Sequence, residues 1–104
     1  MMVQRLKIDP ISFQSVMDET KKVEYRKADK WYIKQNDIIE FYSMYDYQYL
    51  GEVIVTHSEK IILDKNKLRE FYDKGRIDSE TFAFLVDNYE HGQECIKLHV
   101  CPLR

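Results

Sequence analysis

Residues 21–27, KKVEYRK, hold the main sequence evidence for the fold. Read with the two-residue period of a β-strand, Val23 and Tyr25 point to one face, and Glu24 and Arg26 point to the other. We therefore expect a strand that buries its two apolar side chains and holds an acid and a guanidinium about 7 Å apart on its opposite face. Such a face can hydrogen-bond a base edge or a phosphate, or position a group for proton transfer.

A short helix is expected before this strand and a loop after it. Asp9 is a suitable N-cap and Pro10 a suitable first helical residue. The apolar residues that follow them recur at helical spacing, namely Phe13, Val16 and Met17. Residues 27–35 read as a loop, and the Asn-Asp pair at 36–37 is typical of a turn before a strand at 38–43.

The remaining periodic segments predict the rest of the sheet and two further helices. Alternation predicts strands at residues 6–8, 47–57 (bent near Gly51), 60–63 and 94–100. Helical spacing predicts helices that begin at Asp64 and at Asp78 or Ser79 and that end at Gly75 and Gly92. This order predicts an α+β fold: a single domain, residues 1–104, with a small, mostly antiparallel β-barrel flanked by about three helices. We expect its core to contain Val23, Tyr25, Ile38, Phe41, Ile96 and Leu98.

Composition and charge narrow the function classes. The 104 residues are 44% hydrophobic and 33% charged, as in ordinary globular proteins. No apolar run approaches the roughly 18 residues of a membrane span and no signal peptide opens the chain, so we expect a cytoplasmic protein without membrane contact. The net charge is −2, but residues 21–34 carry six basic and two acidic residues. A local basic strip on an acidic body suits a defined anionic ligand better than a long duplex, and a lysine-rich solvated face is the alternative.

The chain resembles the ASCH group of the PUA-like superfamily over residues 6–41 and, more loosely, over 92–100. The signature of that group is a helix, then G-x-K-x-x-E-x-R, then a loop that ends in G-D before a hydrophobic strand. The lysine, glutamate and arginine of the signature match Lys21, Glu24 and Arg26. Further matches are Lys30 at a position often occupied by arginine, Trp31 or Tyr32 at an aromatic position, and Asp37 at the aspartate of G-D.

Three positions depart from the family pattern. Glu19 stands at the glycine of the motif, Asn36 replaces the glycine of G-D, and Glu52 follows Gly51 where close relatives favour arginine. Asn36 is compatible with a positive φ, because asparagine tolerates that conformation better than other non-glycine residues. Glu19 is expected to crowd the turn into the motif strand.

The resemblance implies an RNA- or nucleotide-binding domain, because PUA-like barrels bind RNA and often accept an unpaired or modified base in a pocket beside the barrel. The expected partner is single-stranded or structured RNA or a nucleoside. The residues implied in binding are Lys21, Glu24, Arg26, Lys30, Trp31 and Tyr32. Arg26 would pair with a phosphate or a base carbonyl, and Lys21 would hold a phosphate. Glu24 would accept from an exocyclic amine, and Trp31 or Tyr32 would stack a base. The alternative is a solvated Glu24–Arg26 ion pair without a ligand.

Two branches of the ASCH group imply a hydrolase as an alternative function. One branch resembles an amidohydrolase acting on acylated cytidine, with a lysine, a threonine nucleophile and a glutamate. Lys21 matches that lysine, Glu24 stands at the nucleophile position, and the glutamate position falls near Gly75. A carboxylate at that position can act on water as a general base but cannot replace the threonine. The other branch resembles a metal-assisted ribonuclease, for which the sequence offers no dedicated carboxylate cluster. If the protein is an enzyme, Lys21 and Glu24 are its candidate catalytic residues.

The cysteines predict neither a disulfide nor a metal centre. In an extended strand Cys95 and Cys101 lie about 20 Å apart, too far for a disulfide or for one zinc ion. We therefore expect two free thiols, no metal site and no cofactor. Alternation places Ile96, Leu98 and Val100 inward, and it places Cys95, Lys97, His99 and Cys101 outward.

A run of tyrosines marks a second candidate surface, Tyr42, Tyr45, Tyr47 and Tyr49. The last three are expected on one face of a hairpin, where they either stack bases or pack across the strands. A tyrosine-rich hairpin at 42–49 also suits a third class of function, a protein-binding or inhibitor module.

Overall fold

The computed structural model describes residues 1–103 and divides the chain into two units. The first unit consists of Met1–Lys60 and the C-terminal segment from Ile96 onward, and the second is Ile61–Cys95. The first unit contains the curved part of the sheet and helix α1. The second contains helices α2 and α3.

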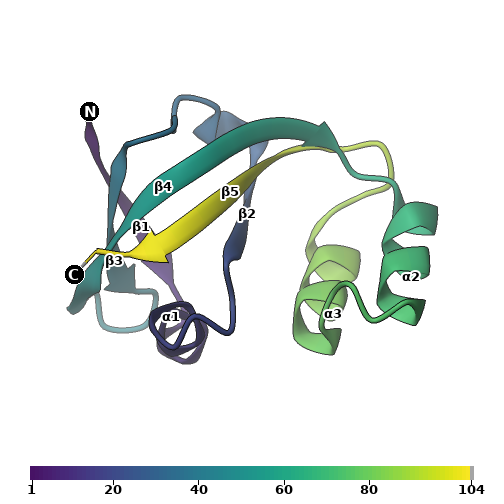
Figure 1. Cartoon of the computed structure of the whole chain (residues 1–104), viewed down its shortest axis with the longest axis horizontal. Helices are drawn as coiled ribbons and strands as arrows, with labels where there is room; N and C mark the ends of the chain where they lie inside the picture. Colours follow the sequence, from purple (N-terminus) through teal and green to yellow (C-terminus); the bar gives the residue numbers. More distant parts are fainter. Residues whose placement is uncertain (104) are drawn as a thin grey trace. The chain divides into compact units, whose positions relative to one another are not determined.

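A five-stranded mixed sheet forms a half-barrel (Figure 1). Its strands are β1 (Val3–Ile8), β2 (Val23–Lys27), β3 (Ile38–Ser43), β4 (Tyr49–Ile62) and β5 (Glu94–Pro102). The strand order is β1-β3-β4-β5-β2, with β1 parallel to β3 and β3 antiparallel to β4. The predicted α+β fold with a small curved sheet and three helices is confirmed. The predicted division of 47–63 into two strands is wrong, because β4 is continuous from Tyr49 to Ile62.

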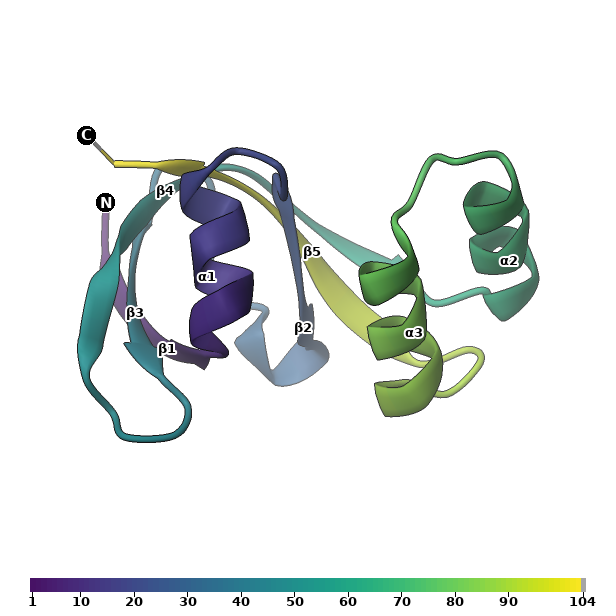
Figure 2. The same cartoon turned by 90° about the horizontal axis from the view of Figure 1, so that it is seen from below.

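Helix α1 (Pro10–Met17) begins as its sequence predicts. The Asp9 carboxylate accepts hydrogen bonds from the backbone N–H groups of Ile11 and Ser12, and Pro10 is the first helical residue. Figure 2 shows α1 between β2 and the strand pair β1–β3. Phe13 and Val16 enter the core from this helix, and the Phe13 ring packs edge-on against Phe41 with the centroids 5.9 Å apart.

The core of the first unit confirms half of the predicted residues and corrects the others. Phe41, Ile96 and Leu98 are buried, whereas Val23, Tyr25 and Ile38 are only half-buried. Two adjacent isoleucines leave the facing of β3 ambiguous, and Ile39 rather than Ile38 turns inward. In β2 the predicted facing is reversed: Glu24 is buried and its apolar neighbours are more exposed. The acid can turn inward because two cations accompany it, as described below.

Both positions where the ASCH signature has glycine adopt positive φ angles in this chain. Glu19 has φ 60° and Asn36 has φ 74°. Glu19 follows Asp18, the C-cap residue of α1, and the next amide, that of Thr20, donates to the carbonyl of Ser15. This is the C-terminal helix position where glycine is favoured, because a Cβ is strained in the left-handed region.

Replacing Glu19 by glycine is therefore expected to stabilise the first unit. The strain of a left-handed glutamate exceeds the entropy that glycine adds to the unfolded chain, so we expect Glu19→Gly to gain about 0.5 kcal/mol. Urea unfolding measures the change. Glu19→Ala is the matched control, since it also removes the carboxylate but keeps the Cβ. An equal gain in both variants would attribute the effect to charge and not to backbone strain.

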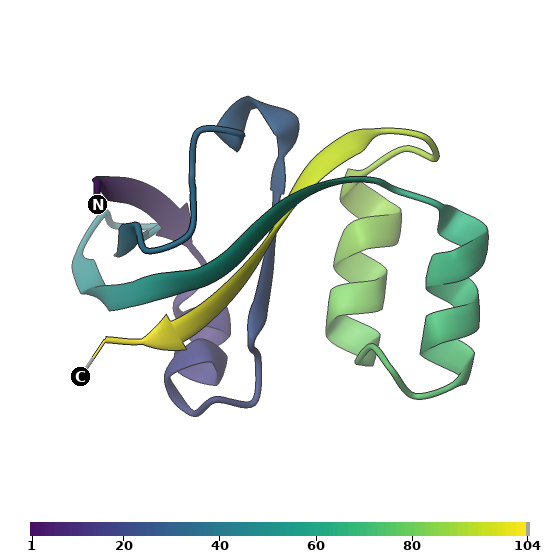
Figure 3. The ribbon, with the colours of Figure 1, turned by 45° about the horizontal axis from the view of Figure 1, so that its top comes forward.

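The second unit is a helical pair, α2 (Lys65–Asp73) and α3 (Ser79–Asn88), which lie side by side (Figure 3). Asp64 and Asp78 cap the two helices through their carboxylates, as predicted. The buried residues of this unit are Leu63, Leu68, Leu85, Tyr89 and Cys95. The outward position predicted for Cys95 is thus wrong: its thiol is fully buried, and that burial raises the pKa of Cys95. No described helix is long and apolar enough to cross a membrane.

Candidate functional site

The motif strand β2 and the residue Lys21, which precedes it, form a three-residue charge cluster, Lys21, Glu24 and Arg26. Lys21 Nζ lies 3.0 Å from Glu24 Oε1, and Arg26 NH2 lies 2.9 Å from Glu24 Oε2. The Glu24 side chain is only 7% exposed, while those of Lys21 and Arg26 are 25% and 21% exposed. A buried carboxylate is tolerated when each of its oxygens has a charged partner. The cluster carries one net positive charge, and its two cations reach solvent more than its anion does.

The guanidinium of Arg26 is fixed from two directions. Its NH2 group donates to Glu24, and its Cζ lies 5.9 Å from the ring centroid of the buried Phe41. Within the described residues, the Glu24 carboxylate accepts all the hydrogen bonds that this guanidinium donates. Arginine has five N–H donors, so most of them remain available to an anion.

The loop that follows β2 is held rigidly at its base. After the turn η1 (Ala28–Lys30), the buried carboxylate of Asp37 accepts hydrogen bonds from the Lys34 and Met2 amides, each at 3.0 Å. Ile33 is fully buried, and its carbonyl accepts a hydrogen bond from Ser58 Oγ at 2.8 Å. Burial alone would raise the pKa of Asp37. The two amide hydrogen bonds, a hydrogen bond from the Gln4 side chain and the N-terminal charge together outweigh burial and lower that pKa below its usual 3.8.

Asp37 is expected to make stability pH-dependent in acid. A carboxyl whose pKa is lower in the folded state stabilises the protein fully above its unfolded value, and the contribution is lost as pH falls through the folded value. We expect Asp37→Asn to be less stable than the wild type near pH 7. The difference should shrink as pH falls from about 5 to about 2. Urea unfolding across that range measures it, and a difference that is constant with pH would contradict the role of the charge.

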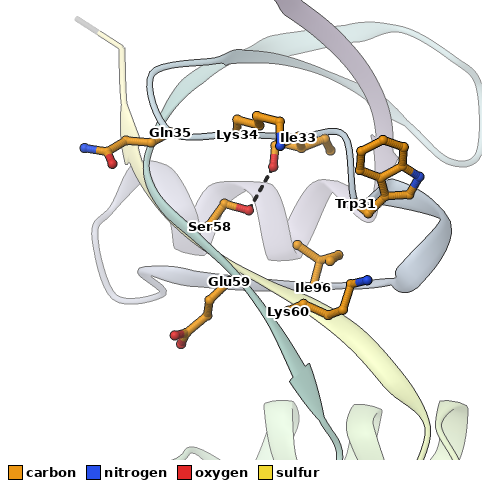
Figure 4. Close-up of a pocket in the computed structure, with 8 residues that line it drawn as sticks. All are labelled: Trp31, Ile33, Lys34, Gln35, Ser58, Glu59, Lys60 and Ile96. Carbon is orange, nitrogen blue, oxygen red and sulfur yellow. Dashed lines mark hydrogen bonds between the residues drawn. The ribbon is translucent and has the colours of Figure 1, made fainter.

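A cavity of about 380 Å³ lies beside this loop (Figure 4). Its lining residues are Trp31, Ile33, Lys34, Gln35, Ser58, Glu59, Lys60 and Ile96. Ile33 and Ile96 are buried apolar walls, whereas Trp31 is 61% exposed. Figure 4 shows Trp31 and the Lys60 ammonium toward one end and the Glu59 carboxylate pointing away from them. Lys34 Nζ lies 5.7 Å from the centroid of the Trp31 ring. This first cavity thus combines an accessible aromatic face with two cations.

A second cavity, of about 270 Å³, lies beside the start of β2. It is lined by Val16, Glu19, Lys21, Lys22, Thr56, His99, Val100, Cys101 and Pro102. Thr56 Oγ1 donates to the carbonyl of His99, and the His99 ring lies 5.4 Å from that of His57. Burial, the nearby Lys97 charge and the His57 ring lower the pKa of His99. Neither the first nor the second cavity is lined by Glu24 or Arg26.

The tyrosines of segment 42–49 do not share one face of a strand. Tyr45 and Tyr47 lie in the turn between β3 and β4, because β3 ends at Ser43 and β4 begins at Tyr49. Tyr45 Oη donates to Asp9 at 2.7 Å, and Lys7 Nζ lies 4.4 Å from the Tyr47 ring. Tyr42 and Tyr49 pack edge-on across the strands, 5.6 Å apart. The four tyrosines therefore make separate contacts, two on the exposed turn and two on the strands that the turn joins.

Comparisons with solved structures identify the fold. The crystal structure of hypothetical protein PH0355 superposes with a TM-score of 0.68 and 16% identity over 99% of this chain and all of that one. The ASCH protein of Zymomonas mobilis gives a TM-score of 0.62 and 15% identity over 98% of this chain and 71% of that one. The ASCH domain of Lactobacillus crispatus gives a TM-score of 0.54 and 6% identity over 97% of this chain and 78% of that one. The chain has an ASCH-like fold. No family model matches the sequence, and the search of curated proteins finds no relative.

In this ASCH-like fold the six residues singled out by the sequence lie in two groups. Lys21, Glu24 and Arg26 are in direct contact with one another. Lys30, Trp31 and Tyr32 follow on the loop, where Trp31 alone of the three lines the first cavity. Lys30 Nζ lies 3.8 Å from Asp29 Oδ2, and the Tyr32 side chain is partly exposed.

No pattern in the sequence selects the other residues of the first cavity. Ser58 and Lys60 come from β4 and Ile96 from β5, far along the chain from Trp31. Lys34 was visible only as one member of the basic strip. No three His, Cys, Asp or Glu side chains within Met1–Leu103 form a group able to hold a metal ion.

Proposed function

We propose that this domain binds RNA or a nucleotide, with a base on Trp31 in the first cavity and the phosphates beside it on lysine and arginine side chains. The observation that supports the proposal most strongly is the exposed indole of Trp31 on a loop whose base is held by Asp37 and Ile33. Stacking needs an accessible aromatic face that is already fixed in place. Lys34 and Lys60 supply positive charge at the same cavity.

The motif cluster has a supporting role in this proposal. Glu24 holds the guanidinium of Arg26 and the ammonium of Lys21 in defined positions, and neither cation has to lose much side-chain freedom when a phosphate arrives. Because Glu24 is buried and both of its oxygens are occupied, we assign it to positioning and not to reading a base edge. Arg26 lies five residues before Trp31, so the two belong to one continuous segment.

The geometry favours binding over hydrolysis. A general base needs a carboxylate oxygen that can reach a water or a substrate proton, whereas each oxygen of Glu24 lies within 3.0 Å of a cation. A hydrolase acting on acylated cytidine or RNA therefore remains the second candidate. A protein-binding module would use the exposed turn with Tyr45 and Tyr47.

The proposal is tested by the affinity for a short single-stranded RNA and by its salt dependence. We expect Arg26→Ala and Lys21→Ala to weaken binding, with circular dichroism showing that both variants fold. The logarithm of the affinity should fall with the logarithm of salt concentration at a slope near 0.7 per phosphate contact. If neither substitution nor added salt changes the affinity, the ligand binds on another surface. Turnover of an acylated cytidine that is lost in Glu24→Gln would favour the hydrolase.

A further inference from the structure

The second cavity has the composition of an anion site. Two lysines line it, Lys21 and Lys22, together with the imidazole of His99 and one acid, Glu19. Its walls also include the apolar side chains of Val16, Val100 and Pro102. Cations at one side of a partly apolar hollow suit a phosphate group carried by an organic moiety such as ribose.

Contacts hold the Lys21 ammonium and the backbone of Lys22 in place. Lys21 Nζ is held 3.0 Å from Glu24 Oε1, and the backbone carbonyl of Lys22 accepts a hydrogen bond from the Val100 amide at 2.9 Å. His99 is fixed through its carbonyl by Thr56 and through its ring by His57. These contacts position the Lys21 ammonium and His99 before a ligand arrives, which reduces the entropy lost on binding. The exposed Lys22 side chain becomes ordered only when the ligand binds.

The positions of the two cavities along the chain suggest how they relate to each other. The second cavity takes Lys21 and Lys22 from just before β2, and the first cavity takes Trp31 to Gln35 from just after η1. Along β2 the two linings are five residues apart, but along β4 they are only two residues apart, with Thr56 in the second cavity and Ser58 in the first, about 7 Å between Cα atoms. The two cavities are therefore neighbours, and a strand of two or more nucleotides can reach from one to the other.

We propose that the second cavity is a phosphate-binding subsite, held by Lys21, Lys22 and His99, for a nucleotide next along the strand from the base stacked on Trp31. The identity of the ligand as a nucleic-acid strand rests on the proposed function, but the binding of phosphate in this cavity does not. Glu19 opposes the ligand charge and limits its affinity.

The test uses the full chain, inorganic phosphate and uridine oligonucleotides, with the His99 imidazole followed by NMR. We expect phosphate to shift the His99 resonances saturably and Lys22→Ala to weaken that binding about fivefold. Lys27→Ala is the matched control, because Lys27 is an exposed lysine at the far end of β2 and does not line the cavity. Glu19→Gln should strengthen phosphate binding.

The outcomes separate the subsite from the proposed function. A tetranucleotide should bind more tightly than uridine monophosphate, and Lys22→Ala should reduce that difference. If Lys22→Ala and Lys27→Ala lose phosphate affinity equally, or if phosphate causes no saturable shift of the His99 resonances, the second cavity is not a phosphate subsite. If Trp31→Ala leaves tetranucleotide binding intact while the phosphate result holds, the proposed function fails and the subsite stands.

Discussion

Trp31→Ala is expected to weaken binding of a short single-stranded RNA by about ten- to a hundredfold, because stacking of one base on an aromatic ring contributes about 1–3 kcal/mol. The indole is 61% exposed, so its removal leaves no hole in the core, and the variant should unfold at nearly the wild-type urea concentration. Fluorescence anisotropy of a labelled oligonucleotide measures the affinity.

Tyr47→Ala is the matched control for this experiment. The Tyr47 side chain is equally exposed, at 61%, and its ring also lies close to a lysine, Lys7. It lies on the turn after β3 and lines neither described cavity. We expect its affinity to match the wild type. If Tyr47→Ala weakens binding and Trp31→Ala does not, the binding site for the ligand, or for a protein partner, is the turn that carries Tyr45 and Tyr47.

Glu24→Ala should cause the largest loss of stability among the charged residues of the first unit, about 3 kcal/mol. The substitution leaves the half-buried Lys21 and Arg26 close together without the anion that neutralises them. Treating Glu24 as an outward residue of β2, as the alternation in the sequence indicates, would predict a cost within about 1 kcal/mol. Urea unfolding followed by Trp31 fluorescence distinguishes the two values, since Trp31 is the chain's one tryptophan and lies in the first unit.

Glu40→Ala is the control, because Glu40 also forms an ion pair within the sheet. Its partner Arg5 is 76% exposed and lies 3.1 Å away, so the loss should be about 0.5 kcal/mol. The combined change Lys21→Met, Glu24→Leu and Arg26→Met should recover much of the stability, since an apolar cluster can replace a buried ionic one. The same triple variant should bind RNA weakly. Equal costs for Glu24→Ala and Glu40→Ala would contradict a buried, structurally necessary carboxylate.

Local rules were enough to predict most of the elements. Asp9, Asp64 and Asp78 cap the helices that their sequence context predicts, because a capping side chain acts on amides only two or three residues away. Asn36 adopts the positive φ that the signature glycine indicates. The residues that interact here are only a few positions apart in the chain, so the local sequence is enough to predict their contacts.

The burial of Glu24 in β2 and of Cys95 in β5 could not be predicted from such local rules. Hydrophobic alternation assigns Glu24 to solvent, yet two cations and the ring of Phe41 beside Arg26 make its burial possible. The same rule predicts that Cys95 points to solvent. Cys95 is buried, and it belongs to the second unit while its neighbour Ile96 belongs to the first. The first cavity also joins Trp31 to Ser58, Lys60 and Ile96, which only the sheet order brings together.

The most direct test of the central claim is the intrinsic fluorescence of Trp31 during titration with a single-stranded RNA. The chain contains one tryptophan, and it forms the exposed wall of the first cavity. Stacking of a base on the indole should quench its emission saturably, with a midpoint equal to the dissociation constant from anisotropy and shifted to higher RNA concentration by added salt. Binding seen by anisotropy with no change in the emission of Trp31 would contradict the claim that the ligand occupies this cavity.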